Sequence, residues 1–203
     1  DGYNLLHAGG FADVRELTAM EAGPKLELPA PDAWKKLAGG MSRAQKLAYL
    51  LDRLVLLNCI QHGQPGGVSF RDPQYQEPLR SLMRSWRSKE MPPQLINPFV
   101  EIQGLALTVA DVPLLASRLF DDRYVPTFSY WRDFHPSRHL YTVTEVAGQL
   151  IDEVARTQLA HAEDFLEADA AARKASVERI VAWSKANASL PETDRLIEIV
   201  RTS

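Results

Sequence analysis

The segment from Trp131 to His139 carries the densest group of side chains suited to binding or catalysis. It combines one large aromatic ring with a carboxylate, two imidazoles and two guanidinium groups: Trp131, Arg132, Asp133, His135, Arg138 and His139. An imidazole can serve as a general base or a metal ligand near neutral pH, and an arginine beside an aspartate can hold an anion or form an ion pair. We expect this segment to be the binding site, with a partly buried arginine–aspartate pair at a groove that receives a peptide or a neighbouring helix.

The same segment has a plainer interpretation as the end of a helix. A histidine near a helix C-terminus interacts favourably with the helix dipole, and Pro136 would stop the helix. His135 and His139 flank that proline, so they are not expected to share a helix face, and the zinc-binding spacing His-Glu-x-x-His is absent. The sequence therefore predicts no catalytic residue and no metal in this segment.

Cys59 and His62 have the spacing of half a zinc site. A structural zinc site needs four ligands, and Cys59 is the only cysteine in the chain. We expect Cys59 to lie on a leucine-rich helix, where a free cysteine behaves as a small apolar residue. Catalysis by this pair is not expected, and no Gly-x-Ser-x-Gly nucleophile elbow occurs. No metal and no cofactor are predicted.

Two further stretches have both a functional and a structural interpretation. Residues 63–69 are rich in glycine and include a hydroxyl, but they lack the lysine of a phosphate-binding loop. They are expected to form a turn, or a loop that closes over a ligand or partner. Arg80, Arg84 and Arg87 share one side of a predicted helix over 78–89. They would bind phosphate or an acidic partner, face solvent, or pair with acidic residues of the C-terminal helices.

Composition narrows the class of protein more than its function. The chain has 203 residues, 45% of them apolar, with 23 basic and 26 acidic side chains and a net charge of −3. A net negative charge makes nucleic-acid binding unexpected. Every apolar run, such as that at 54–57, is far shorter than the roughly 20 residues of a membrane span. The chain does not begin with Met, which is typical of a processed exported protein or of a shortened cytoplasmic one, so no compartment is assigned.

Most of the chain shows helical spacing of apolar residues. Nine of the eleven glycines precede residue 68, and twelve of the thirteen prolines precede residue 137, so irregular structure is expected early and helices later. Residues 1–40 are predicted to form an extended or partly ordered arm, with short helical pieces at 12–20 and 32–37, and residues 41–203 a single helical domain. The expected helices cover residues 42–62, 78–89, 97–106, 108–120, 142–156, 169–187 and 191–201.

Three of these helices carry specific expectations. Capping boxes are predicted at Thr108–Asp111 and Thr142–Glu145. The helix that follows Thr142 should bury one continuous stripe and present its polar side chains on the opposite face. The buried stripe comprises Val143, Val146, Ala147, Leu150, Ile151, Val154 and Ala155. The exposed face comprises Glu145, Gln149, Asp152, Glu153 and Arg156. The last helix is expected to bury Leu196, Ile197 and Val200.

The aromatic-rich stretch 124–134 is compatible with either a helix or a strand. Its Tyr, Val, Thr, Phe and Trp residues favour strands, but no other stretch offers an evident partner strand. We therefore expect a helix beginning at Pro126, and an all-α fold of layered α-hairpins or an irregular helical bundle without a sheet.

Residues 110–122 resemble the first helix of a HEAT repeat. The stretch Ala-Asp-Val-Pro-Leu-Leu-Ala-Ser-Arg-Leu-Phe-Asp-Asp has a proline early in the helix, paired leucines and an aspartate at the turn. Residues 124–134 would be the second helix of the repeat. The resemblance covers about 25 residues and no second copy follows at the expected spacing. It implies a stack of α-hairpins and a protein-binding role.

These observations predict a non-enzymatic helical module that binds a protein or peptide. The alternative is a small-ligand-binding protein or an enzyme whose site joins the 62–71 loop to the 131–139 segment. A shared concave pocket between these two segments would favour the alternative.

Overall fold

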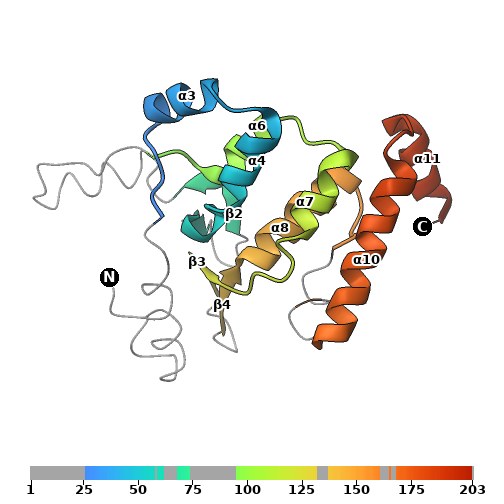
Figure 1. Ribbon diagram of the computed structural model, residues 1–203. Coiled ribbons are helices and arrows are strands. Elements are labelled where there is room, and N and C mark those ends of the chain that lie inside the picture. The colour runs from blue at the N-terminus through green and yellow to red at the C-terminus, as the bar shows by residue number, and fades with distance from the viewer. Residues whose placement is uncertain are drawn as a thin grey trace, which may run out of the picture.

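The described part of the chain combines helices with two small antiparallel hairpins (Figure 1). The computed structural model describes residues 26–57, 59–61, 68–73, 95–131, 137–160, 165 and 168–202. The helices are α3 (Pro31–Gly39), α4 (Arg43–Leu51), α6 (Pro98–Gly104), α7 (Val112–Ala116), α8 (Val143–Ala155), α10 (Ala170–Asn187) and α11 (Glu192–Thr202). Short 3-10 turns cover Leu54–Leu56 and Val109–Asp111. The strands are β1 (Cys59–Gln61), β2 (Val68–Pro73), β3 (Tyr124–Trp131) and β4 (Ser137–Thr142).

The all-α prediction is wrong, chiefly because the stretch expected as a helix from Pro126 is strand β3. It pairs antiparallel with β4, with Phe128 opposite Leu140 and Trp131 opposite Ser137. The aromatic and β-branched residues of this stretch favour a strand, and pairing with β4 stabilises that conformation. Its partner was not evident from the sequence because β4 contains Ser, Arg and His among its apolar residues. The second helix of the HEAT-like unit does not form, so the α-hairpin stack is wrong as well.

The first long helix is also shorter than its apolar periodicity predicts. Helix α4 ends at Leu51, and Leu54 remains buried in a 3-10 turn. Cys59 lies in β1, not on a helix, and its backbone N–H donates to the Thr127 hydroxyl at 3.0 Å. That hydroxyl donates in turn to the Leu57 carbonyl at 2.8 Å. Thr127, which is completely buried, thus ties β3 to the chain entering β1.

The core is formed chiefly by the buried apolar sides of α4, α6, α7 and α8, and α10 packs against α7 and adds Ile180. The predicted capping boxes are present at Thr108–Asp111 and Thr142–Glu145. Asn97 caps α6, since its side chain accepts from the N–H groups of Phe99 and Val100. The predicted α8 stripe is buried, except that Val154 is only half-buried.

The predictions for α11 and α3 can be compared with the structure, whereas two other predicted helices lie outside the described residues. The apolar side chains Leu196, Ile197 and Val200 of α11 are exposed rather than buried. The 32–37 piece lies within α3, whose Trp34 reaches the core. The expected helices over 12–20 and 78–89, with Arg80, Arg84 and Arg87, lie outside the described residues, as do residues 62–67. In the described part of the chain, every helix is too short or too polar to cross a membrane.

Candidate functional site

Three of the predicted site residues, Trp131, Arg138 and His139, lie at one end of the paired strands β3 and β4. Trp131 ends β3 opposite Ser137, and Arg138 lies opposite Tyr130. Arg132, Asp133 and His135 are outside the described residues. Because strands, not helices, flank this segment, the predicted helix end at Pro136 is wrong. The side chain of His139 in β4 is described, and it points to the start of α8.

His139 is joined to a buried carboxylate. Its Nε2 atom contacts the Glu145 carboxylate, and its ring meets the Tyr141 ring edge-on with centroids 4.7 Å apart. Glu145 also accepts hydrogen bonds from the Thr142 N–H at 2.7 Å and the Thr142 hydroxyl at 3.0 Å. The prediction that Glu145 lies on the exposed face is therefore wrong: its side chain is only 8% exposed. The capping box turns it back toward β4, where His139 covers it.

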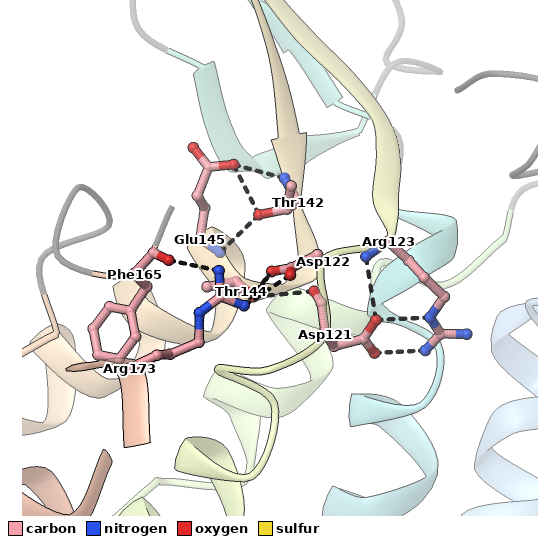
Figure 2. Close-up of polar contacts among 8 residues, drawn as sticks. All are labelled: Asp121, Asp122, Arg123, Thr142, Thr144, Glu145, Phe165 and Arg173. Carbon is pink, nitrogen blue, oxygen red and sulfur yellow. Dashed lines mark hydrogen bonds and ion pairs between the residues drawn. The ribbon is translucent and has the colours of Figure 1, made fainter. Parts of the chain in front are cut away.

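A network of polar contacts holds the first turn of α8 in place (Figure 2). The Thr144 hydroxyl donates to the Asp121 carbonyl at 3.1 Å. Arg173 of α10 contacts both carboxylate oxygens of Asp122 at 2.7 Å and donates to the Phe165 carbonyl at 2.6 Å. These contacts anchor the helix end that carries Glu145 against α10 and the chain leading into β3.

An open hollow of about 450 Å³ lies along α8. One wall consists of the Phe70 and Tyr141 rings from β2 and β4, which meet edge-on with centroids 5.1 Å apart. The opposite wall is the polar side of α8, and the turn at 157–160 closes one end. The α8 residues that line the hollow are Glu145, Gln149, Asp152, Glu153 and Arg156. Segments far apart in sequence, represented by Phe70 and Tyr141, therefore share one concave surface.

The 157–160 turn lies against α8 because two residues permit the approach. The Asp152 carboxylate accepts the backbone N–H groups of Leu159 and Ala160 at 2.8 and 2.7 Å. Gly148 lies beneath the turn, and a Cβ atom there would be 2.8 Å from the Ala160 carbonyl oxygen. Since backbone cannot yield as a flexible side chain does, Gly148 is needed for this close approach.

The rim of the hollow is charged. Glu153 forms an ion pair with Arg71 of β2 at 3.3 Å and accepts a hydrogen bond from Gln103 of α6. Arg156 ends α8 in a left-handed conformation and contacts Glu192 at 3.4 Å. Among the described lining residues, three carboxylates accompany one guanidinium. Each carboxylate has about four lone-pair positions that can accept hydrogen bonds. The charged groups that line the hollow therefore include more acceptors than donors.

The His139–Glu145 contact makes stability depend on pH. The hydrogen bond to Glu145 raises the pKa of His139 above its ordinary value of 6.5; partial burial opposes this shift, and the charge of Glu145 adds to it. Because the pKa of His139 is raised in the folded state, its contribution to the free energy of unfolding is fully present below about pH 6.5. This contribution disappears as the pH rises through the folded-state pKa. We expect the free energy of unfolding to fall over this interval, as measured by denaturant titration at several pH values.

The matched variant for this measurement is His139→Asn. The informative quantity is the difference between the wild-type and variant curves, because the subtraction removes whatever the rest of the chain contributes. That difference should shrink as pH rises. A difference that is constant with pH would show that His139 carries no extra proton in the folded protein.

The sequence did not single out Phe70 or Tyr141, and it treated the acidic residues of α8 as a solvated face. Gln149 and Asp152 lie four and seven residues after Glu145, and this spacing indicated that the three residues share one polar side of the helix. The aromatic wall opposite them depends on tertiary packing. Among the described residues, no group of three His, Cys, Asp or Glu side chains could hold a metal ion.

The chain matches no protein-family model, no curated protein and no solved structure. The geometry of the hollow is therefore what bears on function.

Proposed function

We propose that this protein is a non-enzymatic protein-binding module whose binding site is the hollow beside α8. The observation that carries the proposal is the pairing of an aromatic wall, Phe70 and Tyr141, with an acidic helix face in one concave surface. Concave sites that combine apolar walls with a few convergent polar groups are typical of binding sites. The hollow is open, which suits a side chain presented by a partner's surface.

The chemistry of the walls favours an arginine or lysine side chain of the partner. Aromatic faces attract cations, and a guanidinium forms paired hydrogen bonds with carboxylates. Glu153 is the best placed acceptor, because 30% of its side chain remains exposed while it contacts Arg71. A partner's arginine would add donors to a carboxylate that is already oriented by its neighbours.

A charge reversal at Glu153 tests this proposal. Proteins from the native source are captured on wild type, on Glu153→Lys and on Glu178→Lys, and are quantified by mass spectrometry. Glu178 provides the matched control because it lies on the exposed side of α10, where it pairs only loosely with Lys174 at 3.9 Å. For a captured partner, Glu153→Lys should weaken binding at least tenfold, more than the 1 kcal/mol that marks an important interface residue.

Equal loss in both variants, or no loss in either, would contradict the proposal. Circular dichroism and the thermal midpoint confirm that Glu153→Lys is folded. A second variant, Glu153→Gln, keeps the size of the side chain and removes its charge; it should weaken the same partner less than Glu153→Lys does.

One observation favours a small-ligand-binding protein or an enzyme as a second candidate. Phe70, from the 62–71 segment, and Tyr141, which follows the 131–139 segment, line the same hollow, and His139 contacts its Glu145 wall. An imidazole oriented by a carboxylate is the arrangement of a general base. A small molecule that raises the thermal midpoint of wild type but not of Gln149→Trp, which would fill the hollow, favours this candidate over a protein partner.

A further inference from the structure

Helix α11 has its apolar side facing outward. Leu196, Ile197 and Val200 are 41%, 44% and 79% exposed, although their three- and four-residue spacing places them on one face of the helix. Arg195, on the opposite side, is half-buried with its Nε atom enclosed. Figure 1 shows α11 beside α10 at the edge of the molecule remote from the two hairpins. An amphipathic helix with this orientation is suited to pack against something outside the described fold.

The charged residues beside this apolar face are complementary to the same residues of a second copy of the chain. Asp194 and Arg201 are both exposed and are seven residues apart, so they lie within about 20° of each other on the same flank of the apolar face. When two identical helices pack antiparallel about a two-fold axis, a residue near the start of one helix meets a residue near the end of the other. With the axis near Ile197, Asp194 of each copy would face Arg201 of the other.

We propose that α11 is a dimerisation surface on which a second copy of this chain packs its own α11 antiparallel. The apolar faces of the two helices bury each other, and two reciprocal Asp194–Arg201 pairs set the direction. The surface is distinct from the hollow beside α8, so it does not depend on the function proposed for that hollow. An 11-residue helix provides a small interface, and small interfaces belong to transient complexes. The dimer is therefore expected to dissociate on dilution.

Sedimentation equilibrium of the 203-residue chain, from about 1 µM to about 500 µM, tests for the dimer. Wild type should shift from monomer to dimer within this range. Val200→Asp should abolish the shift, and its high exposure in the monomer means that the fold should tolerate the change. Val100→Asp is the matched control, because Val100 is an exposed valine on α6, and it should leave association unchanged.

Charge exchange then tests the antiparallel direction. Asp194→Arg places arginine opposite arginine, and Arg201→Asp places aspartate opposite aspartate, so each variant alone should dimerise about tenfold more weakly than wild type. An equimolar mixture of the two restores opposite charges at both contacts and should associate more tightly than either variant alone.

Three results would each overturn the proposal: wild type that remains monomeric throughout, a dimer that survives Val200→Asp, or a mixture that gains nothing over its components. The first would mean that something other than a second copy covers α11. The second would place the dimer interface elsewhere. The third would exclude the antiparallel arrangement.

Discussion

Leu150→Ala is expected to lower the free energy of unfolding by about 2–5 kcal/mol, the range for deleting a large aliphatic side chain from a core. Leu150 lies on the buried side of α8 and has no exposed surface. The surrounding elements are held by polar contacts at both ends of α8, so the site cannot easily collapse around the lost atoms. Denaturant unfolding monitored by circular dichroism measures the change.

The neighbouring substitution Gln149→Ala is the control for Leu150→Ala. Gln149 is exposed on the polar side of the same helix, and its replacement should change stability by less than about 0.5 kcal/mol. If both substitutions had the same small effect, Leu150 would not be a core residue.

Glu145→Ala should destabilise the protein by about 1–3 kcal/mol, the cost of leaving a buried hydrogen-bond donor unsatisfied. The substitution removes the half of the capping box in which the Glu145 carboxylate accepts the buried Thr142 N–H. Thermal and denaturant unfolding of the variant would measure the loss.

Glu145→Gln separates the cap from the ion pair. Glutamine serves at the third position of a capping box, so this variant should retain most of the stability that Glu145→Ala loses. It cannot form an ion pair with His139, however, and should therefore lose the pH-dependent part of the stability. Equal destabilisation by alanine and glutamine would show that the charge, and not the cap, is what α8 requires.

The two residues illustrate how the ends and the middle of α8 contribute differently. Leu150 stabilises the fold through burial alone, whereas Glu145 links the helix start to β4 through Thr142 and His139. This link also orients one wall of the hollow. A change at Glu145 is therefore expected to affect both the stability and the binding surface, while a change at Leu150 acts on stability.

The sequence by itself determined the local features of the helices. The capping boxes at Thr108 and Thr142 and the buried side of α8 all follow from contacts within about four residues. Such contacts need no knowledge of distant segments. The same reasoning identified the segment that contains His139, but it assigned the wrong secondary structure to it.

Only the tertiary structure determined which strands pair and which distant side chains come into contact. The strand β3 depends on β4, and the hydrogen bonds between them are invisible to a search for periodicity in one segment. Phe70 faces Tyr141, and Glu145 is buried under His139, because β2, β4 and α8 converge. The exposure of α11 is decided in the same way: its spacing requires one apolar face, but packing places that face outward. Amphipathic spacing specifies that a face needs a partner, and only the arrangement of the whole chain specifies where that partner lies.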